Sequence, residues 1–227
     1  NGMIITKKKD IKEILEALKG AKKVYLFGCD SCAEQCQTGG AKELAAMTGA
    51  LTDNGLEVTG SSLTGETCYK QLVLKEFKHK AAIKESDAIL VLACGAGVRT
   101  VADVAGERTP VMPALDSIFL ATVERYGRFF EGCSLCGECV LADTGGICPH
   151  TECPKGLLNG PCGGVIDGMC EVNIGNGCAW VRIYKRLKAQ GRLHLMRKTR
   201  APKDHSNGVR PRKTLLRGEG AGKGGKG

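Results

Sequence analysis

Eight cysteines lie within the 46 residues from 133 to 178: Cys133, Cys136, Cys139, Cys148, Cys153, Cys162, Cys170 and Cys178. Four thiolates are the usual ligands of one iron–sulfur cluster or of one structural zinc ion, so eight are enough for two such centres. The segment has few apolar side chains with which to build a core. We therefore expect bound metal, rather than hydrophobic burial, to hold this region together.

The first three of these cysteines have the spacing C-x2-C-x2-C, which is the opening of a bacterial ferredoxin motif. Zinc more often takes paired C-x2-C units, although this spacing is compatible with it. Cys148-Pro149 resembles the Cys-Pro that closes ferredoxin motifs, but eight residues separate it from Cys139. The ferredoxin ligand pairing therefore does not transfer, and the division of the eight into two sites stays open. His150 is an alternative fourth ligand for zinc, although a position on the surface or beside a centre is the favoured interpretation.

A second group of cysteines lies in the first half of the chain. Cys29 and Cys32 directly follow a predicted strand, Cys94 follows another, and Cys68 opens the helix after a third. Cys36 lies one helical turn after Cys32. The carboxyl ends of parallel strands meet at one edge of a sheet, where ligands bind. Five cysteines at this edge predict one cluster with four thiolate ligands, with either Cys36 or Cys68 as the cysteine that does not ligate. The alternative is that some of them are buried cysteines that pack as small apolar residues.

Helix and strand patterns alternate over the first 120 residues, which predicts a small parallel-sheet α/β domain of flavodoxin-like or Rossmann-like plan. We expect a helix that Asp10 caps with Glu13 in a capping box. The predicted strands are 24–27, 56–58, 88–93 and 111–115, and the later predicted helices are 33–53, 68–85 and 98–105.

Three regions follow from these patterns. Residues 1–127 form the α/β domain, and residues 128–196 form a loop-rich eight-cysteine module that ends in a helix, in which Trp180 and Tyr184 are expected to pack in the core. Residues 197–227 form a basic, glycine-rich tail with ten Lys or Arg against two Asp or Glu, a net charge of +8 out of +9 for the chain. This composition predicts a tail that is flexible or ordered by a partner, with an acidic protein favoured over nucleic acid because stacking aromatic residues are absent.

Other function classes find little support. The longest apolar run, residues 88–94, is too short to cross a bilayer. We see no signal peptide, take Met3 as the natural start and expect a cytoplasmic protein, in which cysteines bind metal rather than form disulfides. The Gly28–Cys32 loop lacks the G-x-G-x-x-G motif of dinucleotide sites. The four histidines are scattered, so we expect no hydrolytic site.

Longer motifs give a specific resemblance. The segments CGECVLADTGGICPHTECPKGLLNGPCGG, DGMCEV and CAWVRIYKRL resemble the methylenetetrahydrofolate reductase C-terminal family, as do GCDSCAEQCQTGG, ETC, ACGAGVRTVAD and PALD nearer the N-terminus. The resemblance covers about residues 20–195. This family occurs as the small iron–sulfur subunit, sometimes described as zinc-finger-like, of the methylenetetrahydrofolate reductase of acetogenic bacteria.

The resemblance implies a non-catalytic electron-transfer subunit in a hetero-oligomer of one-carbon metabolism. In that family a separate flavin-bearing TIM-barrel subunit reduces methylene- to methyl-tetrahydrofolate, and the small subunit passes it electrons from an upstream donor protein. It implies that Cys29, Cys32, Cys94 and either Cys36 or Cys68 hold one cluster. The eight later cysteines would hold two further sites, giving two or three [4Fe–4S] clusters, with one zinc site left open.

Two other functions stay under consideration. A zinc-stabilised structural or interaction subunit would contain zinc, have no visible absorbance and lack a redox role. An independent flavin or thiol oxidoreductase that uses the sheet edge would carry bound flavin. An iron–sulfur subunit purified without oxygen would instead be brown.

Overall fold

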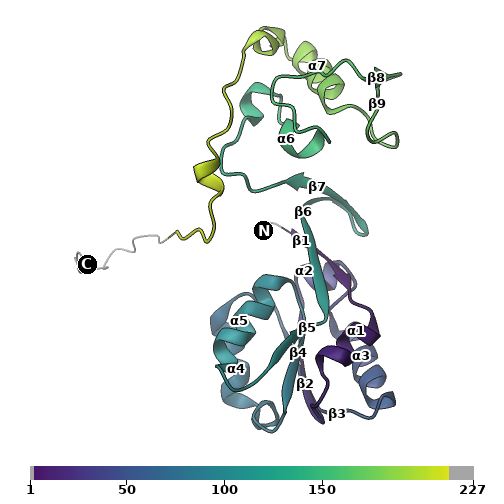
Figure 1. The fold of residues 1–227 in the computed structure, drawn as a ribbon, viewed down its shortest axis with the longest axis vertical. Coiled ribbons are helices and arrows are strands. Elements are labelled where there is room, and N and C mark those ends of the chain that lie inside the picture. The colour runs from purple at the N-terminus through teal and green to yellow at the C-terminus, as the bar shows by residue number, and fades with distance from the viewer. Residues whose placement is uncertain (1–2, 215–227) are drawn as a thin grey trace, which may run out of the picture. The chain divides into compact units, whose positions relative to one another are not determined.

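The structure, a computed structural model, describes residues 3–214 (Figure 1). The chain divides into two compact units, residues 1–132 and residues 133–227. Asn1 and Gly2, which precede the expected start at Met3, and residues 215–227 of the basic tail lie outside the described residues. Within residues 3–214 no helix has the length and apolar character needed to cross a membrane.

A four-stranded parallel sheet forms the centre of the first unit, as predicted. Its strand order is β3-β2-β4-β5. The inner strands β2 (Lys23–Cys29) and β4 (Ala88–Leu92) are almost wholly buried, because both are continuous apolar runs that are covered on both faces. The outer strands are β3 (Glu57–Thr64) and β5 (Val111–Pro113).

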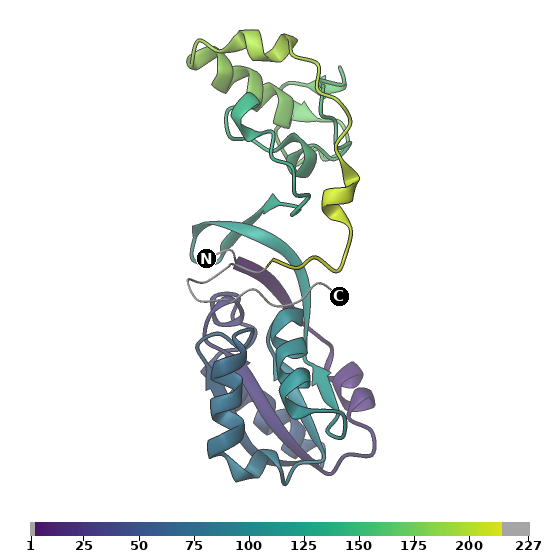
Figure 2. The ribbon, with the colours of Figure 1, turned by 90° about the vertical axis from the view of Figure 1, so that its left-hand side faces the viewer.

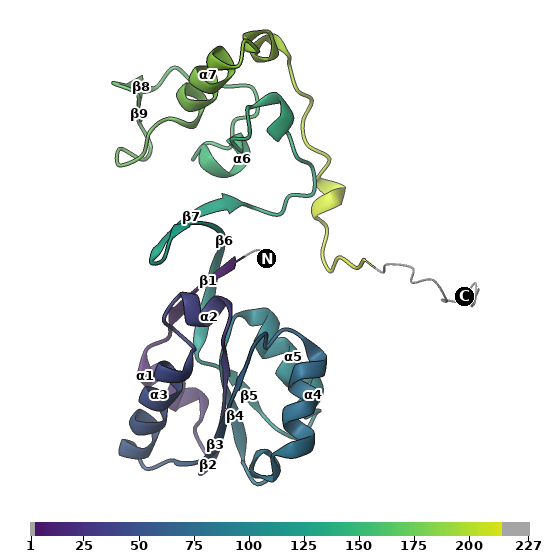
Figure 3. The ribbon, with the colours of Figure 1, turned by 180° about the vertical axis from the view of Figure 1, so that it is seen from behind.

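Helices cover both faces of this sheet (Figure 3). On one face lie α1 (Ile11–Ala17) and α3 (Ala41–Asp53), and on the other lie α4 (Lys70–His79) and α5 (Gly95–Ala105), with a short 3-10 turn at Ala81–Ile83. The predicted cap of α1 is present, since the Asp10 side chain accepts from the Lys12 N–H at 2.7 Å. Glu13 pairs instead with the Lys9 ammonium at 2.5 Å.

The single helix predicted over 33–53 is wrong, because the chain forms two helices there. The short α2 spans Cys32–Gln35, and α3 begins at Ala41. Between them Gln37 has a left-handed backbone with φ 56°, and the N–H groups of Thr38 and Gly39 both donate to the Ala33 carbonyl. The Gly39 carbonyl then accepts from the Cys29 N–H at 2.9 Å, which attaches this loop to the end of β2.

A second sheet of the first unit was not predicted. It has the order β1-β6-β7, from β1 (Met3–Lys8), β6 (Leu115–Arg125) and β7 (Arg128–Cys133). The long curved β6 continues directly from the parallel sheet and pairs antiparallel with β1 (Figure 2). The strand predicted over 111–115 is therefore two strands, because β5 ends at Pro113 and β6 begins at Leu115.

The second unit is built mostly of loops. Its core consists of Ile147, Cys178, Trp180, Ile183 and Leu187. Trp180 is buried, as predicted, but Tyr184 is 44% exposed, so its predicted core role is wrong. The regular elements are η2 (Leu141–Asp143), α6 (Pro149–Glu152), β8 (Val165–Ile166), β9 (Met169–Cys170), α7 (Ala179–Ala189), η3 (Leu193–Arg197) and η4 (His205–Gly208).

Candidate metal centres

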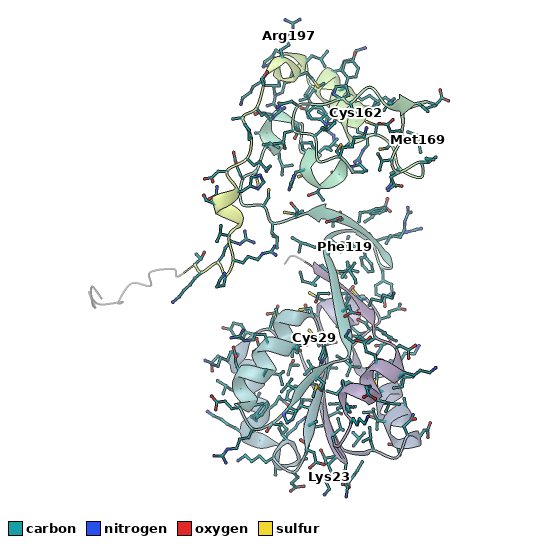
Figure 4. The ribbon with its side chains drawn as sticks, viewed as in Figure 1. Lys23, Cys29, Phe119, Cys162, Met169 and Arg197 are labelled. Atoms are coloured by element: carbon teal, nitrogen blue, oxygen red, sulfur yellow. The ribbon has the colours of Figure 1, made fainter. Side chains whose placement is uncertain are left out.

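Four cysteines of the first unit line one cavity of about 270 Å³. They come from three separate loops at the carboxyl edge of the parallel sheet. The cavity is lined by Cys29, Ser31, Cys32, Glu66, Thr67, Cys68, Ala93, Cys94 and Gly97. Figure 4 labels Lys23 and Cys29 at the two ends of β2, and the cavity lies at the Cys29 end.

The topology of the sheet brings these loops together. Cys29 is the last residue of β2 and Cys32 the first of α2, whereas Cys94 is the N-cap of α5 after β4. β2 and β4 are neighbours, but the helices that follow them lie on opposite faces of the sheet. The chain therefore opens a crevice between the two strand ends, which is the ligand site of open α/β sheets. Cys68, between β3 and α4, is the fourth thiol of this crevice.

The unpredicted second sheet contributes to this site. The Ser117 hydroxyl on β6 accepts from the Gly95 N–H at 2.8 Å, directly beside Cys94. On the opposite side, the hydroxyls of Thr6 on β1 and Thr38 lie 2.6 Å apart, which fixes the loop between α2 and α3. Sequence reasoning missed these positions because their role depends on the pairing of β1 with β6.

Burial and charge differ among the four thiols. Cys29 and Cys94 are buried, and Cys68 is exposed. Although Cys68 is exposed as a residue, its thiol is partly desolvated, and this desolvation raises its pKa. The negative charges of Cys94 and Cys29 raise the pKa further. Without a bound cation the site therefore disfavours the thiolate at Cys68. Thiolates are the ligands that iron–sulfur clusters and zinc require, and a metal would remove this penalty, so the donor set fits a metal group.

Cys36, the fifth cysteine of this half, lies apart from the cavity lining. Its Sγ faces the Ile4 carbonyl of β1 at 3.8 Å. Cys36 does lie one helical turn after Cys32, since its N–H donates to the Cys32 carbonyl at 3.1 Å, but α2 packs against β1 and the Cys36 sulfur lies beside that strand.

None of the thirteen cysteines, all within the described part of the chain, forms a disulfide bond. Over residues 3–214, no three or more Cys, His, Asp or Glu side chains are arranged as the ligands of one metal ion. A tetrahedral zinc site holds each sulfur about 2.3 Å from the ion, which brings neighbouring sulfurs to within about 4 Å of one another.

The eight cysteines of the second unit are spread over its loops and element ends. Cys148 and Cys178 are the N-caps of α6 and α7, Cys153 ends α6, and Cys170 lies on β9. The Cys162 Sγ lies 3.7 Å from the Glu171 carboxylate, which also pairs with Lys155. Figure 4 labels Cys162 within this unit. The assignment of these eight as ligands stays a prediction.

The loop that begins at Cys133 has cationic and N–H donors directed at its sulfurs. The Leu135 N–H donates to the Cys133 Sγ at 3.3 Å, and the Lys203 ammonium donates to the Cys136 Sγ at 2.9 Å. The hydrogen bond from Lys203 lowers the pKa of the Cys136 thiol, with a smaller contribution from the Glu138 backbone. These donors stabilise thiolates, as metal ligation by this loop would require.

A separate cavity of about 170 Å³ lies beside Cys136 and Lys203, and His150 is among its lining residues. The sequence pattern gave no signal for Lys203, because it lies in the tail that composition predicts to be flexible or ordered by a partner.

One of the comparisons with known proteins gives a match. Residues 112–206 match the family model described as methylene-tetrahydrofolate reductase C terminal. This segment is therefore similar to the family with that description, over less than half of the chain. No curated protein and no solved structure matches the chain.

The match bears on the resemblance predicted from sequence. It confirms that resemblance over residues 112–195 and associates this segment with an oxidoreductase of one-carbon metabolism. It includes the eight-cysteine module and Lys203, but not the cavity of the first unit, so the resemblance over residues 20–111 stays a prediction.

Proposed function

We propose that this protein is an iron–sulfur electron-transfer subunit of a methylenetetrahydrofolate reductase complex. The observation that carries the proposal is the single cavity lined by Cys29, Cys32, Cys68 and Cys94. A bound [4Fe–4S] cluster would accept and release one electron at a time. The family match at residues 112–206 supplies the link to the reductase.

The residues of the chain have distinct tasks in this function. Cys29 and Cys94 hold the group from the buried side of the crevice, and Cys68 ligates from its exposed side. The exposed side is where a partner protein can come within electron-transfer distance. We infer that the partner on this path is the flavin-bearing catalytic subunit, and that an upstream protein supplies the electrons.

Two observations favour a cluster over a single zinc ion in this cavity. Its four cysteines come from three loops around a space of about 270 Å³. No group of ligands in residues 3–214 has the closeness that one ion requires. A polynuclear cluster holds its four thiolates further apart than a zinc ion does, and so suits this arrangement. Cys36 is not among these four cysteines, because its sulfur faces the Ile4 carbonyl instead. We therefore take Cys36, rather than Cys68, as the cysteine that does not ligate the cluster.

The test compares two single substitutions in the full chain, purified without oxygen. Cys68→Ser removes a proposed ligand, and Cys36→Ser is the matched control. Iron, acid-labile sulfide and zinc are measured per chain, together with the electron paramagnetic resonance spectrum after reduction. We expect Cys68→Ser to lose about four iron atoms and one signal, and Cys36→Ser to keep both.

Other outcomes would contradict either the ligand set or the redox function. Loss of iron in Cys36→Ser, with retention in Cys68→Ser, would contradict the ligand set. Wild-type protein that is colourless and holds only zinc would overturn the redox function and leave the zinc-stabilised subunit. For the wild-type complex, reduced small subunit should reduce the flavin of the catalytic subunit, and Cys68→Ser should slow that step.

A further inference from the structure

The first part of the basic tail contacts the loop that carries Cys133 and Cys136. The Asp204 N–H donates to the Glu138 carboxylate at 2.9 Å, and the Arg212 guanidinium donates to the Leu135 carbonyl at 2.8 Å. At Gly137, where φ is 86°, a Cβ would lie only 2.9 Å from that of Asn207. Residues 203–212 therefore hold the backbone of this loop at several points.

Lys203 is the most buried residue of this contact, at 9% exposed. Burial of an ammonium is costly unless the charge is compensated. Its Nζ donates to the Cys136 Sγ at 2.9 Å and also to the Glu138 carbonyl. Among the described residues, no carboxylate forms a salt bridge with it; the Glu138 carboxylate is engaged by Asp204. The Cys136 sulfur is thus a group that, as a thiolate, would compensate the buried cation.

The position of Lys203 is fixed by a neighbouring anchor on the same segment. The Arg200 guanidinium donates to the carbonyls of Leu158 and Asp143 at 3.1 and 3.2 Å, and its Cζ lies 5.9 Å from the centre of the Trp180 ring. The Arg200 N–H and carbonyl both bond to the Asn159 side chain at 2.8 Å. Because Arg200 is bound to the core of the unit, the backbone near it is held in place. This backbone positions Lys203 beside Cys136.

We propose that Lys203 is a positioning residue for the metal centre that Cys136 helps to ligate, and that its charge raises the reduction potential of that centre. Reduction adds negative charge to the centre and its thiolates. An ammonium hydrogen-bonded to one of these sulfurs stabilises the reduced form more than the oxidised form. The inference rests on the proposed iron–sulfur function, and extends it from the ligands to a residue of the tail.

The test is a redox titration of the full chain, followed by electron paramagnetic resonance. Lys203→Met removes the charge and the donor with little change in volume. Lys198→Met is the matched control, because Lys198 is on the same segment but pairs with Asp143 at 2.7 Å and not with a sulfur. We expect the midpoint potential of one centre to fall in Lys203→Met. The potentials of all centres should stay at their wild-type values in Lys198→Met.

Lys203→Arg covers the case in which Lys203→Met fails to assemble the centre. Loss of iron in Lys203→Met, with iron and potential kept in Lys203→Arg, supports a charge that positions Cys136. Wild-type potentials at every centre of Lys203→Met would overturn the inference, as would zinc at the Cys136 site by anomalous scattering. In both cases the function proposed for the first cavity would stand. Absence of any redox-active centre in the wild type would defeat that function itself.

Discussion

The Thr67 hydroxyl donates to the Gly28 carbonyl at 3.0 Å, so the loop of Cys68 is bonded directly to the end of the strand that carries Cys29. Thr67 is fully buried, and its hydroxyl also lies 2.9 Å from that of Thr64. This small network joins two of the three loops that line the first cavity. The spacing of its cysteines therefore depends on hydroxyl groups that are not themselves ligands.

Thr67→Val should weaken both the fold and the metal site. The change keeps the shape of the side chain but removes one of two hydroxyl donors to the Gly28 carbonyl, leaving Thr64 at 3.4 Å. The expected cost is about 0.5–1.5 kcal/mol in the free energy of unfolding. Iron content per chain should fall as well. Urea unfolding and iron analysis measure the two effects. Thr52→Val is the control, because its hydroxyl bonds only within α3 at an exposed position. Equal losses in both variants would contradict the role of Thr67.

Gly97→Ala should disturb the same cavity from the α5 side. A Cβ at Gly97 would lie 2.8 Å from the Ala93 Cβ and 3.2 Å from the Thr67 Cβ, so the start of α5 must shift away from these two residues of the cavity lining. Overpacking of this kind costs about 1–3 kcal/mol. The measurements are the thermal unfolding midpoint and the iron content.

Gly49→Ala is the matched control for this substitution. Gly49 also lies inside a helix, but no atom lies within 4 Å of the added Cβ. Alanine there should stabilise the protein by about 0.4–1 kcal/mol. If Gly97→Ala behaved like Gly49→Ala, the close packing of α5 against the cavity would not matter for the site.

The sheet and the cysteines of its edge were predictable because their signals are local. β4 is an unbroken apolar run, and Cys94 follows it at once, so the general geometry of parallel strands was enough to place this thiol. The position of Cys36 was not predictable in this way. It depends on the packing of α2 against β1, a strand that was not predicted, which brings Cys36 beside Ile4.

Two other features needed contacts between distant parts of the chain. β6 has a mixed polar and apolar sequence, and its extent is set by its pairing with β1 more than a hundred residues earlier. Lys203 lies in a polar segment whose composition gives no sign of burial. Its place is determined by Arg200 on Trp180 and by the Cys136 sulfur, and such partners cannot be read from spacing.

The raised pKa of Cys68 predicts a pH dependence for the metal-free protein. Burial, and then the charges of Cys94 and Cys29, raise this pKa above the ordinary value of 9.0. The folded state therefore binds the thiol proton more tightly than the unfolded chain does. As the pH rises above about 9, the unfolded chain loses this proton first, and the free energy of unfolding falls. This stability is fully present below pH 9 and is lost as the pH rises through the folded-state pKa.

Urea unfolding of metal-free, fully reduced protein from about pH 8 to about pH 10.5 would measure this loss. Cys68→Ser should lose less stability than the wild type over this range, because the serine hydroxyl does not titrate there. Cys36→Ser should follow the wild type. Parallel losses in wild-type and Cys68→Ser protein, both metal-free, would mean that Cys68 is not held among the other thiols of the cavity.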